Sequence, residues 1–424
     1  MQRDKIPPLV EVTKGAELEA RVAQVWFWEG YFARFGVNLQ RHYSPETLQV
    51  TDLDLLAYDF SPTLVRSKVI GEVKSGSRDK PLDRSIWLGG LLQLVKADAG
   101  EVTTRSVPSL KVRNLARTLG VTAQSVEDLE RREKAIGVFE LGELGSQGKQ
   151  AVRTLDEVRA ICKADPDLDR AFWFLRSEVW FLDPISSCKK IIGLLKQLSV
   201  RWTPGVDVAD DRSLRWLFAE SIVVFVLNVV TISGYALTLD ERNFASLLTE
   251  RLSEGAIPIN EMRRLGTKID KYIAGILTAA KAPAAIKVDA MGALEPQAPE
   301  YTETFIELAL RLRAVPLEAR RAPRQFDLLL HERLSNRREP ATIGAQRIGL
   351  NSTGGGARLR RIIGAFLRAQ AGLPDEIANA ISLDVVGAPT SKTTLDDDHL
   401  TPVQGLLLEA SDSSLVPDDS QRSR

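Results

Sequence analysis

VIGEVKSG, residues 69–76, places an acid and a base two positions apart within a run of apolar residues. Side chains of a β-strand alternate between the two faces of a sheet, so Glu72 and Lys74 share one face while Val73 points to the other. An isolated pair of this kind is usually a surface ion pair that contributes little to stability. It can also be half of a catalytic site, and the surrounding sequence has to decide between the two interpretations.

A second alternating stretch lies upstream, where residues 50–59 read VTDLDLLAYD. The alternation predicts a strand in which Asp52 and Asp54 share the face opposite Leu53 and Leu55. If the two predicted strands are neighbours, Asp54 meets Glu72 and Lys74, with Asp52 one step further out. Clustered carboxylates are costly to bury unless a cation compensates their charge. The two strands together therefore indicate a functional site.

The region around these strands has the element order of an α/β domain. Apolar residues at helical spacing predict an amphipathic first helix that stops at Gly36. The expected elements are a helix at 15–36, strands at 37–43, 48–60 and 65–75, a helix at 82–98, a strand at 101–106 and a helix at 109–120. This order predicts a mixed sheet flanked by helices within residues 1–140.

Residues 112–133 allow two interpretations. Ala116, Gly120, Val126 and Leu129 have the spacing of a helix-turn-helix, whose second helix would enter a DNA major groove. The same residues also suit a helix followed by a short fifth strand, VTAQSV. We favour the strand, because a helix-turn-helix here would leave the sheet short.

The second half of the chain changes character after a glycine-rich linker at 141–150. Long helical periods predict a mainly α-helical domain over residues 151–386. The remaining residues, 387–424, are rich in Asp and Ser and are expected to form a disordered acidic tail. The apolar run at 221–239 contains polar residues and barely reaches the length of a bilayer, so we expect a buried helix there.

The overall composition is that of a soluble globular protein. Hydrophobic residues make up 44% of the 424 residues, charged residues 26%, and the formal net charge is zero. The two cysteines, Cys162 and Cys188, have neither metal-site spacing nor the number needed for a disulfide framework. The first residues lack the apolar core of a signal peptide. We expect a cytoplasmic protein that does not associate with membranes.

Three spaced elements resemble the PD-(D/E)XK, or restriction-endonuclease-like, nuclease superfamily. They are LE at 18–19, TDLDLLA at 51–57 and GEVKSG at 71–76, and the resemblance extends over roughly residues 1–135. It implies a restriction-endonuclease-like fold for the N-terminal domain. No nucleotide-binding G-x-x-x-x-G-K-[ST] pattern occurs, so the chain carries no helicase motor of its own.

The resemblance also implies an activity and a set of catalytic residues. Asp54 and Glu72 would hold Mg²⁺, with Mn²⁺ as a substitute, because both cations accept oxygen ligands. Lys74 would act on the attacking water, and Glu19 on the leading helix would contact the metal or its water shell. The implied protein is a metal-dependent endonuclease of nucleic acid, with DNA favoured over RNA as substrate, in a bacterial or phage defence or DNA-processing system.

Two basic regions favour a nucleic-acid partner. Residues 60–118 carry eleven Lys and Arg against five Asp and Glu, and residues 311–368 carry thirteen Arg against four acids. Arginine binds phosphate in a bidentate way, and the glycines of residues 351–361 could offer backbone N–H groups to a phosphate. The alternative is a loop followed by a solvated helix face. The expected nucleic-acid-binding residues are Arg78, Lys80, Arg358, Arg360 and Arg361.

Other functions fit the sequence as well. The main alternative is a non-catalytic nucleic-acid-binding protein or regulator that retains the nuclease fold. A further one is a helical interaction scaffold whose N-terminal domain is structural. In any of these, the helical domain could bind a partner protein or a second copy of the chain.

Overall fold

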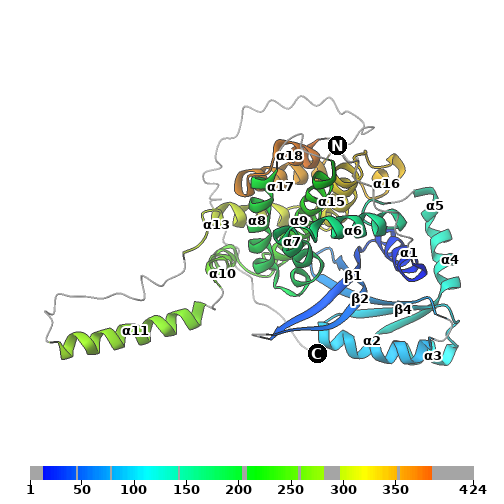
Figure 1. Cartoon of the computed structure of the whole chain (residues 1–424), viewed down its shortest axis with the longest axis horizontal. Coiled ribbons are helices and arrows are strands. Elements are labelled where there is room, and N and C mark those ends of the chain that lie inside the picture. The colour runs from blue at the N-terminus through cyan, green and yellow to red at the C-terminus, as the bar shows by residue number, and fades with distance from the viewer. Residues whose placement is uncertain are drawn as a thin grey trace, which may run out of the picture. The chain divides into compact units, whose positions relative to one another are not determined.

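The computed structural model describes residues 13–383 except for 44–45, 77–78, 142–143, 203–207, 256–258, 281–296 and 351–353. The predicted acidic tail at 387–424 and the predicted phosphate contact Arg78 lie outside the described residues. The described part of the chain forms one compact unit. The expected α/β and helical regions are both present within it (Figure 1).

Five strands form one mixed sheet in the order β1-β2-β3-β4-β5. They are β1 (Phe32–Tyr43), β2 (Glu46–Phe60), β3 (Arg66–Lys74), β4 (Ala99–Thr104) and β5 (Val121–Ser125). The first three strands pair antiparallel, and β3, β4 and β5 pair parallel. The prediction of a mixed α/β sheet in the N-terminal region is confirmed.

Four helices cover this sheet. They are α1 (Lys14–Glu29), α2 (Pro81–Val95), α3 (Leu110–Thr118) and α4 (Val126–Ile136). The crossovers between the parallel strands run through α2 and α3, which lie side by side along one face, while α1 and α4 lie toward the other (Figure 1). Leu88 and Leu92 of α2 pack on β4 at Gly100, where an added Cβ would lie 2.9 Å from Leu88 Cδ2.

The first helix ends earlier than predicted. Its last residue is Glu29, and Gly30 closes it with a positive φ of 125°. Residues from Phe32 onward belong to β1, because they pair with the end of β2 in the register Phe32↔Tyr58. The prediction that the helix extends to Gly36 is therefore wrong.

Residues 112–133 do not form a helix-turn-helix. A strand, β5, separates α3 from α4 and completes the sheet beside β4, with Gln124 opposite Thr103. Ser125 then starts α4 through a capping box with Asp128. The predicted fifth strand is confirmed.

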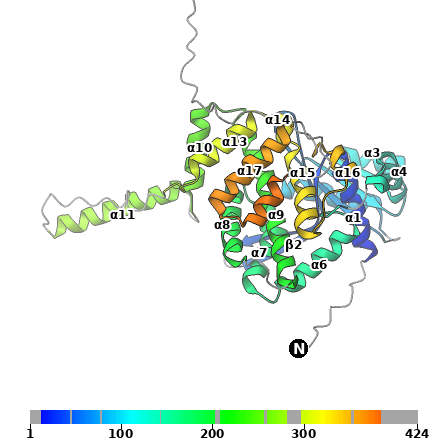
Figure 2. The same ribbon diagram turned by 90° about the horizontal axis from the view of Figure 1, so that it is seen from above.

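The rest of the described chain is helical (Figure 2). Its elements are α5 (Val138–Leu141), α6 (Lys149–Cys162), α7 (Pro166–Arg176), η1 (Glu178–Phe181), α8 (Pro184–Arg201), α9 (Val208–Tyr235), α10 (Glu241–Ser253), α11 (Ile259–Ala279), α13 (Thr302–Arg313), α14 (Pro316–Ala319), α15 (Ala322–Leu330), η2 (His331–Ser335), α16 (Thr342–Arg347), α17 (Gly355–Ala371) and α18 (Asp375–Ser382). Within the described ranges, only α9 is long and apolar enough to cross a bilayer, and 94% of its apolar stretch is buried inside the protein. It is the central helix of this region.

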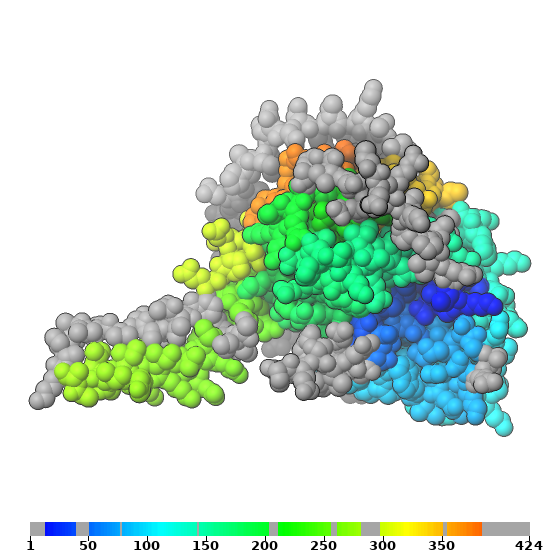
Figure 3. Space-filling model, in the orientation of Figure 1, coloured from blue at the N-terminus to red at the C-terminus, as the bar shows by residue number. Residues whose placement is uncertain are grey.

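The sheet and the helical region share one hydrophobic core. Phe32 of β1 and Tyr58 of β2 lie 6.2 and 6.3 Å, between ring centroids, from Trp180 of η1. The same buried cluster continues through α8 and α9 to α17. Figure 3 shows the surface of the sheet region, in blue and cyan, joining that of the helices directly.

A buried ion network joins the two regions at β1. The Arg34 guanidinium is 2.8 Å from Glu220 Oε1 on α9 and 2.8 Å from Asp327 Oδ1 on α15. Ser146 donates its hydroxyl hydrogen to Asp327 Oδ2 at 2.6 Å, and His331 Nε2 lies 3.2 Å from Glu220 Oε2. All five residues are buried. The network fixes the strand next to β2, which carries the candidate site.

Candidate functional site

Asp54, Glu72 and Lys74 come together where β2 and β3 pair. Leu55 pairs with Gly71 in the antiparallel register, and Asp54 and Glu72 occupy the next positions of the two strands. The Lys74 ammonium lies 2.7 Å from Asp54 Oδ2 and 3.0 Å from Glu72 Oε1. The three residues predicted from strand alternation therefore form one cluster on one face of the sheet.

The two carboxylates are held more tightly than the ammonium. The backbone N–H of Val73 donates to Asp54 Oδ2 at 2.8 Å, which fixes that carboxylate against β3. The side chains of Asp54, Glu72 and Lys74 are 14%, 4% and 28% exposed. Lys74 is therefore the member of the cluster that is most accessible to a molecule approaching from solvent.

Glu19 faces the same cluster from α1. Burial and the nearby negative charges of Asp54 and Glu72 together raise its pKa to about 7, against the opposing effect of Lys74. Desolvation and the charge of Asp54 also raise the pKa of Glu72. The three acids therefore repel one another electrostatically, and bringing all of them into the ionised state requires a compensating cation.

Lys74 supplies part of that compensation. Burial alone would lower its pKa, but the ion pairs with Asp54 and Glu72 raise it above the usual value. The lysine therefore stays protonated at neutral pH. A protonated lysine can donate hydrogen bonds and cannot act as a base.

Arg84 is a member of the site that the sequence did not identify. It lies in the first turn of α2, with Nη1 3.4 Å from Glu72 Oε1 and Nη2 2.9 Å from Asp79 Oδ1. From the sequence, Arg84 is only one of the eleven Lys and Arg of residues 60–118. Its position could have been inferred from a helix start that follows β3 closely, but the direction of that helix depends on tertiary packing.

The donor set suits a hard divalent cation. Mg²⁺ is usually held by one or two carboxylates together with water and substrate phosphates, and Asp54 and Glu72 provide two. Among the described residues, no group of three or more His, Cys, Asp and Glu side chains has a geometry that could hold a metal ion. Glu19 lies close enough to this pair for its pKa to respond to both charges.

The expected phosphate contacts differ in their surroundings. Lys80, at the start of α2, and Arg358 and Arg361, on α17, are exposed. Arg360 is only 2% exposed, and its Nη1 donates to the carbonyl of Leu350 at 3.3 Å. The expectation for Arg360 is wrong, because the helical period that exposes Arg358 and Arg361 turns Arg360 toward the core.

Comparisons of this chain with family models, with curated proteins and with solved structures find no match. The site therefore has to be interpreted from its own residues. Its chemical content is two fixed carboxylates, a third carboxyl with a raised pKa, and a protonated lysine at the solvent side.

Proposed function

We propose that this protein is a metal-dependent endonuclease that hydrolyses phosphodiester bonds, with DNA favoured over RNA as substrate. The observation that carries the proposal is the cluster of Asp54, Glu72 and Lys74, with Glu19 beside it. The order of helix, three antiparallel strands, helix and parallel strand around the cluster is consistent with the resemblance to PD-(D/E)XK nucleases. Fold alone does not imply function, so the support for this activity comes from the cluster and not from the topology.

Each residue has a role that its surroundings support. Asp54 and Glu72 would hold Mg²⁺, which when bound polarises the phosphoryl oxygen and lowers the pKa of water. The Val73 N–H and the Arg84 guanidinium fix the orientation of these two carboxylates.

Lys74 would donate hydrogen bonds to the attacking water and to the phosphate, and its charge would offset the charge that develops in the transition state. With Asp54 and Glu72 holding a cation, the Lys74 ammonium would be free to turn toward substrate. Glu19, protonated in part at neutral pH, could accept or release a proton near the same water.

Substitution of Lys74 tests the chemistry directly. We expect Lys74→Ala to lower the cleavage rate by about a hundredfold to a thousandfold, because the lysine acts mainly on the transition state. Binding of nucleic acid should be largely preserved. Lys196→Ala, which removes an exposed lysine from α8, is the matched control and should cleave at the parental rate.

The measurement is a time course of plasmid and RNA cleavage with Mg²⁺, Mn²⁺ or EDTA, paired with a binding assay of the same variants. Cleavage by Lys74→Ala at the parental rate would show that residues 69–76 form a strand with an ion pair and have no catalytic role. Faster loss of the plasmid than of the RNA would support DNA as the substrate.

Removal of a carboxylate should give a different defect. Asp54→Asn keeps the size of the side chain but removes a ligand charge, so we expect weaker metal binding and little cleavage with Mg²⁺. Because Mn²⁺ binds most sites more strongly than Mg²⁺ does, a high Mn²⁺ concentration should recover part of the activity. Equal activity of the variant and the parent at low Mg²⁺ would exclude Asp54 as a ligand.

A second candidate function is non-catalytic binding of nucleic acid by a protein that retains this fold. It is favoured by the position of Lys74, whose ammonium lies between the two carboxylates as a buried ion pair would. Such a protein should shift labelled DNA without metal and leave it intact with metal.

A further inference from the structure

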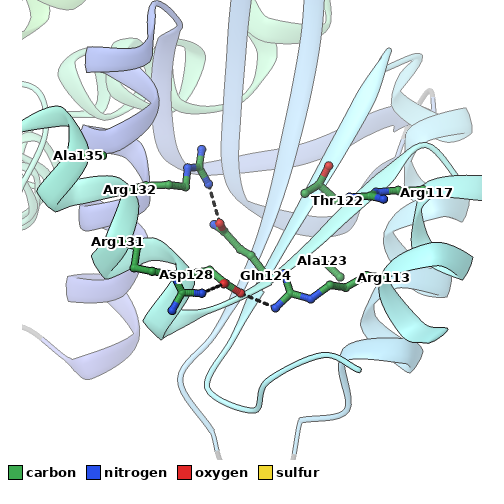
Figure 4. A pocket seen from close by; sticks show the side chains of 9 residues that line it. All are labelled: Arg113, Arg117, Thr122, Ala123, Gln124, Asp128, Arg131, Arg132 and Ala135. Atoms are coloured by element: carbon green, nitrogen blue, oxygen red, sulfur yellow. Dashed lines mark hydrogen bonds and ion pairs between the residues drawn. The ribbon is translucent and has the colours of Figure 1, made fainter. Parts of the chain in front are cut away.

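A basic pocket lies at the outer edge of β5, away from the carboxylate cluster. Its volume is about 380 Å³, and Figure 4 shows the side chains around it. The lining residues are Arg113, Arg117, Thr122, Ala123, Gln124, Asp128, Arg131, Arg132 and Ala135.

The four arginines reach this pocket from both faces of the sheet. Arg113 and Arg117 come from α3, whereas Arg131 and Arg132 come from α4. Strand β5 lies between the two helices and is the last strand of the sheet. An edge strand leaves part of its backbone hydrogen-bonding groups unpaired. The pocket therefore combines guanidinium groups with a polar strand edge.

One arginine of the pocket is neutralised internally. Arg132 lies 2.7 Å from Glu29 and 2.9 Å from Glu101, and it also donates to Gln124 at 2.7 Å. These contacts hold Arg132 in the wall of the pocket. It therefore shapes the site and does not supply a cation to a ligand.

Two of the other three arginines, Arg113 and Arg131, face a single carboxylate. Asp128 pairs with Arg113 at 2.6 Å and with Arg131, so both guanidinium groups turn toward the same point (Figure 4). Burial would raise the pKa of Asp128, but the Ser125 N–H and Arg113 lower it to about 2. Asp128 is therefore ionised at neutral pH, and Arg113 and Arg131 share its one negative charge.

Arg117 completes the charge excess. Within the described part of the chain it has no ion-pair partner, and Figure 4 shows it extending beside Thr122, an exposed residue. Arg131 is also accessible, with 69% of its side chain exposed. An anion placed here would meet two reachable guanidinium groups and a hydroxyl donor.

We propose that this pocket binds a phosphate group, of a free nucleotide or of a nucleic-acid backbone. Phosphate matches the donors, because arginine binds it through parallel N–H···O bonds and a dianion would balance the excess charge. The volume lies within the range of small-ligand pockets. β5 is separated from β3 by β4, a distance of about 10 Å across the sheet. The pocket is therefore a second site and does not depend on cleavage.

Binding measurements in EDTA test the proposal without any contribution from catalysis. Pyrophosphate, ATP and a labelled single-stranded oligonucleotide are titrated at fixed ionic strength against the parent protein and Arg117→Gln/Arg131→Gln. We expect the double variant to bind at least about tenfold more weakly, because each lost guanidinium removes a charge-assisted hydrogen bond.

Two further variants sharpen the result. Arg117→Lys keeps the charge but loses the bidentate geometry, so it should fall between the parent and the double variant. Arg242→Gln removes an exposed arginine from α10 and should bind like the parent. Far-UV circular dichroism of each variant establishes that the fold is retained.

The outcomes separate the sources of the phosphate. Binding of pyrophosphate and ATP that is weakened by the double variant identifies a small phosphate ligand. Binding of the oligonucleotide alone, weakened by the same variant, identifies the backbone of a nucleic acid. The proposal is overturned if no phosphate probe binds, or if Arg242→Gln weakens binding as much as the double variant does.

Discussion

The protonation of Glu19 is the residue-scale feature that separates the candidate site from an ordinary ion pair. A surface salt bridge keeps its groups ionised, whereas here burial and two neighbouring carboxylates raise the pKa of Glu19 to about 7. A carboxyl group with such a pKa changes its charge in the range where enzymes operate.

The pH dependence of stability should reveal this carboxyl group. The pKa of Glu19 is 4.5 in the unfolded state, its usual value, and about 7 in the folded state. Between these two pH values the folded state binds more protons than the unfolded state, so the free energy of unfolding falls as the pH rises. Above pH 7 Glu19 is ionised in both states, and the free energy of unfolding is lower by at most about 3 kcal/mol than at acidic pH. Glu19→Gln should remove this loss and stabilise the protein at pH 8 but not at pH 4.

Urea unfolding at several pH values without divalent metal measures the effect. Glu17→Gln, on the same helix, is the matched control, because Glu17 is a half-exposed carboxylate paired with Lys149. Parallel pH profiles for the parent and Glu19→Gln would show that Glu19 is not buried against the cluster.

Strand alternation was sufficient to predict which residues of the cluster share a face, since Asp54, Glu72 and Lys74 needed only neighbouring strands. Alternation said nothing about Arg84, whose contact with Glu72 depends on how α2 packs. For the helix α17, the sequence alone does not show which side faces solvent. The prediction that Arg360 binds phosphate is wrong for this reason, because Arg360 is buried. Local periodicity relates residues within an element, and tertiary packing decides which side of a helix meets solvent.

At the scale of elements, a glycine lets α1 approach the sheet closely. An added Cβ at Gly71 would lie 2.8 Å from Leu55 Cδ1 and 2.9 Å from the Trp26 ring. Trp26 crosses β3 at this point and donates its Nε1–H to Glu101 at 3.0 Å. The glycine of GEVKSG therefore brings the helix that carries Glu19 next to the strand that carries Glu72.

Two alanine substitutions should separate this role from helix propensity. Gly71→Ala should lower the free energy of unfolding by about 1 to 3 kcal/mol, because the core around it is already filled. Gly90→Ala on α2, where an added Cβ has nothing within 4 Å, should raise it by about 0.5 to 1 kcal/mol. Denaturant midpoints measure both, and a neutral Gly71→Ala would contradict the close approach of Trp26.

The extent of the strands was predicted to within a few residues, except at the start of β1. Gly30 and Gly36 both have a positive φ, so both satisfy the local requirement for a helix end. The pairing of β1 with β2 decides between them. Gly36 instead lies inside β1, where its carbonyl accepts a hydrogen bond from Arg176 Nη2 at 2.6 Å.

At the scale of the whole molecule, the sheet and the helices are joined by charges that are far apart in the sequence. Arg34 is bonded to Glu220 and Asp327, which lie on two different helices. Burial would raise the pKa of Glu220, but the Arg34 guanidinium and His331 hold it well below its usual range. No local pattern predicts such a network, because its members acquire their partners only when distant segments fold together.

The network makes a sharp prediction about stability. Arg34→Leu leaves Glu220 and Asp327 as buried carboxylates without their cation. We expect the free energy of unfolding to fall by about 3 to 5 kcal/mol, the usual effect of removing one partner of a buried ion pair. Lys149→Ala is the matched control. Its ion pair with Glu17 lies at the surface, so its loss should cost less than about 1 kcal/mol.

A triple variant separates the charge from the packing. Arg34→Leu combined with Glu220→Gln and Asp327→Asn removes the uncompensated charges and should recover part of the lost stability, because the unpaired carboxylates cause most of the defect. Because Arg34 bonds a strand of the sheet to two helices, the parent should unfold in one transition whether unfolding is followed by tryptophan fluorescence or by far-UV circular dichroism. A loss of stability below about 1 kcal/mol in Arg34→Leu, or a fluorescence transition well separated from the loss of helix, would show that the sheet and the helices are stabilised independently.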